Sequence, residues 1–193
     1  MQYIRLFAII AVLTVVLSGC NVSVNSTGTG YPGTTATAGS SGPSGPTGAE
    51  PNWGVQTKTS GCVAHNGLAD SACTPGALLP QGTKDAICQS GYSRSVRNVP
   101  ISEKDQVYAE YGIASRAPGE YEVDHLVSLE LGGSNDISNL WPELASPQPG
   151  FHQKDQVENY LHAQVCSGAI SLKEAQIEIA TNWLAVYDRM PKA

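Results

Sequence analysis

An uncharged segment near the start of the chain limits how much of it can fold. Residues 21–49 contain no charged side chain, few large apolar ones and many Gly, Ser, Thr and Pro. Such a segment buries too little apolar surface to offset the entropy lost on ordering. We therefore predict a disordered, flexible tether over residues 20–52 and one folded domain over residues 53–193.

The first 19 residues have the pattern of an export signal. Arg5 precedes an apolar run from Leu6 to Leu17, which is too short for a comfortable membrane span, and LSGC then ends at Cys20. LSGC resembles the bacterial lipobox, in which the cysteine is lipidated and becomes the first mature residue. We expect Cys20 to anchor the chain firmly at the cell envelope, the outer membrane in a Gram-negative cell, through two or more acyl chains. An ordinary signal peptide with an unmodified cysteine is the alternative.

Four cysteines follow the tether, namely Cys62, Cys73, Cys88 and Cys166. An even number of cysteines in an exported domain favours disulfides, and no two of these form the C-x-x-C pair of a zinc knuckle. Four cysteines allow three pairings. We expect Cys62–Cys73 as a local loop and Cys88–Cys166 as a long-range link to a late helix.

The net charge of −6 argues against a chain that grips nucleic acid over its whole surface. A local basic face remains open, because residues 84–116 hold five basic and four acidic side chains.

Apolar spacing predicts three helices, at about residues 103–112, 153–166 and 172–188. Ser171 with Glu174 three positions later forms a capping box at the start of the last helix. Two short strands are expected within residues 121–131, ended by Gly132-Gly133, and the prolines at 142, 147 and 149 predict a loop.

The segment from Tyr121 to Glu143, YEVDHLVSLELGGSNDISNLWPE, combines a DH pair, a GGSND turn and an Asn fourteen positions past the His. These features, with His152 and Lys154 further on, resemble the HNH nucleases of the His-Me finger, or ββα-metal, group. The resemblance covers residues 121–158. It implies an α+β fold with a small ββα-metal core, to which this chain adds further helices.

Hydrolysis of a phosphodiester needs a base for water and a cation for the phosphate charge. A neutral imidazole suits the first role near neutral pH, and we predict that His125 is this base. Asp124 and His152 are the predicted ligands of a divalent metal ion, Mg²⁺ or Mn²⁺ before Zn²⁺ or Ni²⁺. Because neighbouring residues of a strand point to opposite sides, Asp124 and His125 cannot both face the metal.

Three basic side chains and one amide complete the predicted site. The resemblance implies that Asn139 holds the loop that presents the catalytic His. Lys154 lies at the start of a predicted helix and could reach a phosphate. Arg94 and Arg97, in GYSRSVR, are further phosphate-binding candidates.

These residues predict a metal-dependent HNH-type endonuclease at the cell envelope, with DNA preferred over RNA as the partner. The alternative is a non-catalytic envelope lipoprotein that uses the ββα scaffold for binding or support. A metal-dependent plasmid-nicking assay separates the two.

Overall fold

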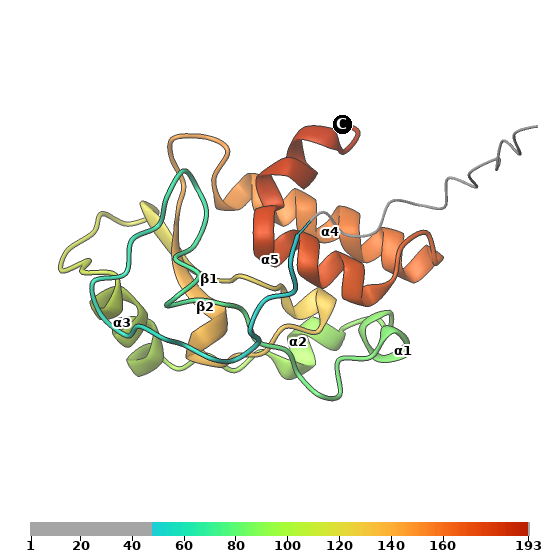
Figure 1. The fold of residues 1–193 in the computed structure, drawn as a ribbon, viewed down its shortest axis with the longest axis horizontal. Coiled ribbons are helices and arrows are strands. Elements are labelled where there is room, and N and C mark those ends of the chain that lie inside the picture. The colour runs from blue at the N-terminus through green and yellow to red at the C-terminus, as the bar shows by residue number, and fades with distance from the viewer. Residues whose placement is uncertain (1–47, 193) are drawn as a thin grey trace, which may run out of the picture. The chain divides into compact units, whose positions relative to one another are not determined.

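The computed structural model describes residues 48–192 and has the predicted α+β class (Figure 1). In chain order its helices and strands are α1 (Lys84–Ile87), α2 (Tyr92–Val96), α3 (Ile101–Glu110), β1 (Tyr121–His125), β2 (Leu140–Leu144), α4 (Phe151–Ser167) and α5 (Leu172–Arg189). Within residues 48–192, no helix is both long and apolar enough to cross a bilayer. The predicted signal peptide, Cys20 and most of the predicted tether lie outside the described residues.

The two strands form an antiparallel pair, with Tyr121 opposite Leu144 and His125 opposite Leu140. The prediction placed both strands within residues 121–131, and this was wrong for the second strand. After β1 the chain instead makes two short 3-10 turns, Leu129–Leu131 and Ile137–Asn139. The order strand, strand, helix nevertheless follows, because α4 begins soon after β2.

The second strand was missed because Pro142 lies inside it. Leu126 N–H donates to Asn139 O and Ala145 N–H donates to Glu120 O. These two residue pairs are hydrogen-bonded pairs of the ladder, and every second pair between them is hydrogen-bonded as well. In this register the pair of Val123 with Pro142 is a non-hydrogen-bonded pair. The nitrogen of Pro142 therefore faces the outer edge of the sheet, where a missing N–H costs no ladder bond.

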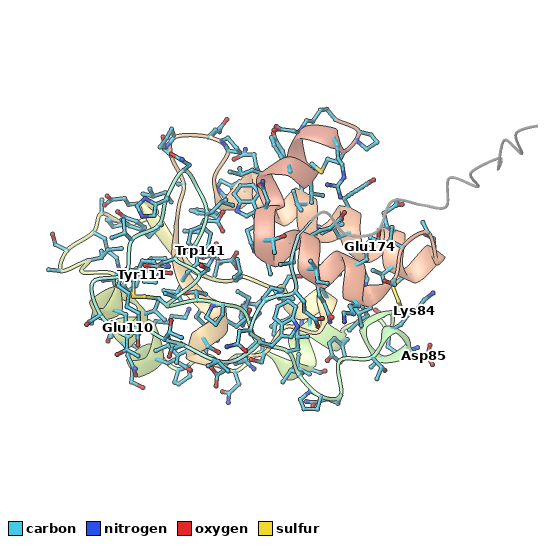
Figure 2. All side chains as sticks on the ribbon, in the orientation of Figure 1. Lys84, Asp85, Glu110, Tyr111, Trp141 and Glu174 are labelled. Atoms are coloured by element: carbon cyan, nitrogen blue, oxygen red, sulfur yellow. A yellow bond between two sulfur atoms is a disulfide. The ribbon has the colours of Figure 1, made fainter. Side chains whose placement is uncertain are left out.

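The two faces of the hairpin pack against different helices. Val123 and Leu140 form a small core with Val107 and Tyr108 of α3. The other face carries Trp141, which is buried near the middle of the fold (Figure 2).

A larger apolar core joins α4 and α5 to the loop after β1. The loop contributes Val127 and Leu131. The buried members on the two helices have helical spacing and include Val157, Leu161, Val165, Ile179, Trp183 and Val186. Trp183 also donates from Nε1 to the Gly67 carbonyl, 2.9 Å away, which ties the early loops to α5. Trp141 and Trp183 are among the largest fully buried side chains of the described residues.

The long helices start and end where local signals predict. Ser171 accepts from the Glu174 N–H at the start of α5, and Gly168 ends α4 with a left-handed φ of 83°. One departure is Asn182, whose non-helical backbone interrupts α5 and whose Oδ1 accepts from the Ala185 N–H. The side chain thus caps the second part of the helix.

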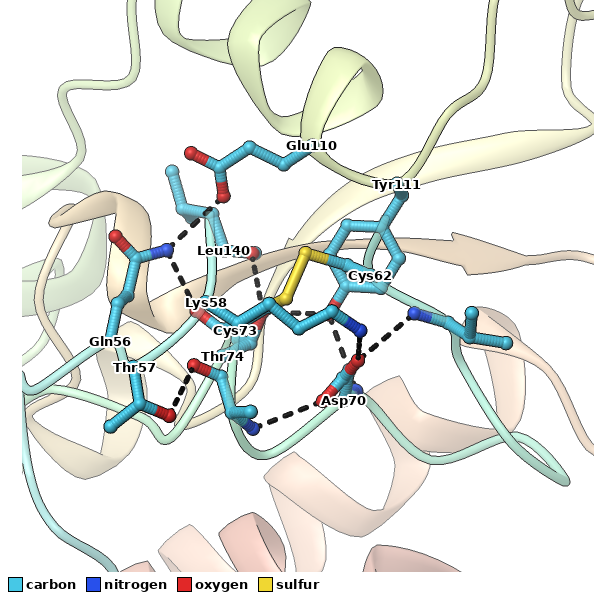
Figure 3. The surroundings of a disulfide bond; sticks show 12 residues. Gln56, Thr57, Lys58, Cys62, Asp70, Cys73, Thr74, Glu110, Tyr111 and Leu140 are labelled. Carbon is cyan, nitrogen blue, oxygen red and sulfur yellow. Dashed lines mark hydrogen bonds and ion pairs between the residues drawn. A yellow bond between two sulfur atoms is a disulfide. The ribbon is translucent and has the colours of Figure 1, made fainter. Parts of the chain in front are cut away.

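Both predicted disulfides, Cys62–Cys73 and Cys88–Cys166, are present. The first lies in a loop that hydrogen bonds attach to α3 and β2 (Figure 3). Gln56 donates to both the Cys73 carbonyl and Glu110, at 2.7 and 3.1 Å. Thr74 donates to the Leu140 carbonyl at 3.1 Å, so this loop covers part of the outer edge of β2.

The second disulfide holds α1 against α4. Helices α1 and α2 were not predicted, because segments of four and five residues show no usable period.

Candidate active site

The end of β1 sends Asp124 and His125 to opposite sides, as strand geometry predicts. Asp124 Oδ2 accepts from Lys154 Nζ of α4 at 2.7 Å. The His125 ring points the other way, where its Nε2 lies 3.2 Å from Asn135 Oδ1.

Asn139 holds the loop that follows His125. Its Oδ1 accepts from the Val127 and Ala77 N–H groups, at 2.9 and 3.3 Å, and its Nδ2 donates to the Val127 and Ser134 carbonyls, at 3.0 and 2.8 Å. The side chain is fully buried and makes all four of its hydrogen bonds. This geometry is that of the loop-holding role predicted for Asn139.

At Gly133, the second glycine of the turn, steric contact with the backbone requires glycine. A Cβ at this position would lie 1.8 Å from the Val127 carbonyl oxygen, so only glycine fits. Because Asn139 also binds that carbonyl, the glycine and the amide together shape the turn after the His125 strand.

Replacing Asn139 with alanine is expected to lower the free energy of unfolding by about 3 kcal/mol, because buried backbone groups lose their only partners. Urea unfolding followed by circular dichroism measures the change. Asn159→Ala is the matched control, because Asn159 is exposed on α4, and it should change stability by less than about 0.5 kcal/mol. Equal losses in the two variants would contradict the role of Asn139.

The hydrogen bonds around Asn135 determine which nitrogen of His125 carries the proton. Asn135 Nδ2 donates to the Val96 carbonyl at 2.8 Å, and its Oδ1 accepts from the Asn98 N–H at 3.1 Å. Oδ1 is therefore an acceptor for His125 as well, and Nε2 must be the donor. In the neutral ring Nδ1 then has a free lone pair that can accept a proton.

Burial keeps His125 neutral at physiological pH. The residue is only 3% exposed. Burial lowers the pKa of His125 to about 4, although the Asp124 carboxylate and the Asn135 hydrogen bond oppose this effect. The imidazole is thus in the form that can act as a base.

Arg97 lies at the C-terminal end of α2, between the two residues whose backbone groups bind Asn135. Its guanidinium is exposed and acts on the pKa values of His125, Glu122 and Asp155. Arg94 is also exposed and makes no ion pair within residues 48–192, and its phosphate-binding role stays a prediction.

Lys154 corrects one prediction. Its Nζ donates to Asp124 Oδ2, the His125 carbonyl and Glu158 Oε1, at 2.7, 2.8 and 2.5 Å. The side chain is 0% exposed. Three acceptors use all three N–H donors of the ammonium, so Lys154 cannot serve as a phosphate-binding group.

The electrostatics of this cluster follow from burial. Burial alone would lower the pKa of Lys154, but the carboxylates of Asp124 and Glu158 raise it above its usual value. Burial would likewise raise the pKa of Asp124, and the ammonium holds it below its usual value. The Lys154–Asp124 contact is thus an ion pair at neutral pH.

A third carboxyl group, Glu143 of β2, completes the cluster. It is buried, and neither of its oxygens has a hydrogen-bond donor within residues 48–192. Burial raises the pKa of Glu143, and the nearby Asp124 carboxylate adds to the effect against the opposing Lys154. Glu143 therefore keeps its proton at neutral pH.

His152, the second predicted metal ligand, has different surroundings from those of Asp124. It is exposed in the first turn of α4, and its ring centroid is 4.3 Å from that of Phe151. No hydrogen bond or ion pair connects His152 to Asp124 in the described part of the chain, and Asp124 is already paired with Lys154. The expected ligand pair for a divalent ion therefore does not fit this arrangement.

A different group of side chains has metal-ligating geometry. One ligand atom each from Cys88, His162 and Cys166 lies within 4.8 Å of the others, so this group could hold a metal ion. With the disulfide closed the sulfurs are not thiolates, and binding would require its reduction. The Nε2 atom of His162 also lies 3.0 Å from the Ile87 carbonyl oxygen.

Comparisons with family models, curated proteins and solved structures found no match to this chain. The sequence did not single out Asn135, Glu143 or Asp155. The spacing of Asn135 within the GGSND turn was the one signal available for it. The other two gain their surroundings only from the packing of β2 and α4 on β1.

Proposed function

We propose that this protein hydrolyses phosphodiester bonds of nucleic acid, with DNA as the expected substrate. The supporting observation is the His125 ring, which is neutral, is oriented by Asn135 through Nε2 and has Nδ1 left as a proton acceptor. Arg97 lies close enough to influence its charge. A base beside an exposed cation is the minimum that water attack on a phosphodiester needs.

The reaction follows from these positions. Nδ1 of His125 takes a proton from a water molecule as the water oxygen forms its bond to phosphorus. The bond from phosphorus to the 3′ oxygen breaks, and that oxygen takes a proton from solvent. The Arg97 guanidinium offsets charge on the non-bridging oxygens. Asn139 and Asn135 keep the base in place.

The resemblance also implies a divalent metal ion, Mg²⁺ or Mn²⁺ before Zn²⁺ or Ni²⁺. Because the Asp124 carboxylate is already paired with the Lys154 ammonium, the proposal assigns no step to such an ion.

The proposed location is the bacterial cell envelope, with a lipid anchor at Cys20 and a tether before the domain. Two disulfides favour an oxidising compartment outside the cytoplasm. The net charge of −6 favours weak, non-specific and salt-sensitive binding of nucleic acid.

The test is nicking of supercoiled plasmid by the full chain, in EDTA and with each of Mg²⁺, Mn²⁺, Zn²⁺ and Ni²⁺. His125→Ala should lower the rate by about 10²–10⁴-fold, the usual contribution of a general base. Arg97→Ala should also lower it without loss of stability, because this side chain is exposed. With a pKa of about 4 for His125, kcat/KM should stay level from pH 8 to pH 5 and fall only near pH 4.

His65→Ala is the matched control, because His65 is exposed and outside the site, and it should keep full activity. Circular dichroism checks the fold of each variant. Absence of cleavage of DNA and RNA by the folded native chain under every condition would refute the proposal. It would support the alternative of a non-catalytic binding module.

A further inference from the structure

We propose that the Lys154 ammonium is the built-in cation of the junction between Asp124 of β1 and Glu158 of α4, and that this junction therefore binds no divalent metal ion in the native protein. The inference deepens the proposed function, and its activity measurement rests on that function. Its binding measurement does not.

The first reason is geometric. The junction has one carboxyl group from the strand and one from the helix, and Nζ lies 2.7 Å from an oxygen of the first and 2.5 Å from an oxygen of the second. A cation shared by the hairpin and the helix would need these same two oxygens. Divalent ions bind carboxylate oxygens at about 2.0–2.6 Å, so the ion and the ammonium would compete for one position.

The second reason is that the ammonium has no other place to go. Its third N–H donates to the His125 carbonyl at 2.8 Å, and the side chain is fully buried. Movement toward solvent would give up three hydrogen bonds and leave a buried cation unpaired. A divalent ion entering beside a retained ammonium would meet like-charge repulsion at short range.

The arrangement also makes Lys154 a positioning residue. Through the carbonyl of His125 it ties the backbone that carries the proposed base to α4. The ammonium therefore supplies, without a ligand from solution, the link between strand and helix that a bound ion would otherwise supply.

Side-chain length suggests a substitution that should let the junction bind a divalent ion in place of the ammonium. A histidine imidazole reaches about 2 Å less far from the backbone than a lysine ammonium, and a metal bonds to it at about 2.1 Å. In Lys154→His, a bound ion would lie near the point now taken by Nζ. Asp124 and Glu158 would then complete a set of three ligands.

The experiment titrates Mn²⁺ into the full chain, with its disulfides oxidised, and counts free Mn²⁺ by electron paramagnetic resonance. The native protein should bind none at this junction. Lys154→His should bind one equivalent, and addition of Glu158→Gln to that variant should abolish it. Lys173→His is the matched control and should bind none, because Lys173 is 65% exposed in a surface pair with Glu50.

Native binding of one Mn²⁺ that is lost in Asp124→Asn would overturn the inference, and this measurement does not depend on Lys154→His folding. In the nicking assay, equal native rates in EDTA and Mn²⁺ support it. Native activity that EDTA abolishes and Mn²⁺ restores would overturn it and leave the hydrolase proposal standing. If the native chain is inactive, the hydrolase proposal fails, and Mn²⁺ binding alone decides the inference.

Discussion

Replacing Lys154 with methionine is expected to lower the free energy of unfolding by about 3–5 kcal/mol, the usual loss when one partner of a buried ion pair is removed. Methionine keeps most of the buried aliphatic stem, so the loss reports the ammonium and not the packing. Asp124 and Glu158 would be left in a largely buried position with no cation between them. Urea unfolding at pH 7, followed by tryptophan fluorescence, gives the value.

The pH dependence of this loss has a definite sign. Without the ammonium, burial raises the folded-state pKa of the two carboxyl groups above the unfolded values of about 4. The folded variant then binds more protons than the unfolded chain. Its loss in free energy of unfolding, relative to the native protein, is therefore largest near pH 7 and shrinks as the pH falls toward 4.

A surface lysine provides the control. Lys173→Met removes an exposed pair with Glu50 and should cost no more than about 1 kcal/mol. If Lys154→Met cost as little as this control, Lys154 would not be holding the junction together.

Removal of the Cys88–Cys166 disulfide, by replacing both residues with serine, is expected to cost about 4.5 kcal/mol in the chain-entropy description for a separation of 78 residues. The same replacement at Cys62 and Cys73, 11 residues apart, should cost about 2.8 kcal/mol. The longer loop costs more because the unfolded chain regains more freedom when it opens.

Urea unfolding of the two double variants, beside the oxidised native chain, measures both losses. A larger loss for the Cys62–Cys73 pair would contradict this order. It would point instead to the hydrogen bonds around that loop, in which Gln56, Asp70 and Thr74 take part (Figure 3).

The junction and the loop serve the proposed base from two sides. Lys154 holds the backbone of His125 against α4, and Asn139 holds the loop that follows it. Asn135 then orients the ring itself. The base is thus constrained at its backbone, at its following loop and at its Nε2 atom.

Structural features that depend on residues within one or two helical turns of each other could be predicted from the sequence. The apolar spacing and the Ser171 cap predicted α5, and the glycine at 168 agrees with the end of α4. The spacing of Gly133 and Asn139 also indicated the turn after β1, because a turn that binds its own backbone is a local structure.

Contacts between distant segments were decided only by the tertiary structure. Pro142 argues against a strand when read alone, and it is tolerated because β1 pairs with the other edge of β2. Lys154 has the residue type of a phosphate ligand, yet packing of α4 on the hairpin buries its ammonium between Asp124 and Glu158. A residue type determines which partners a side chain can accept, and the packing of the elements determines which partner comes within 3 Å of it.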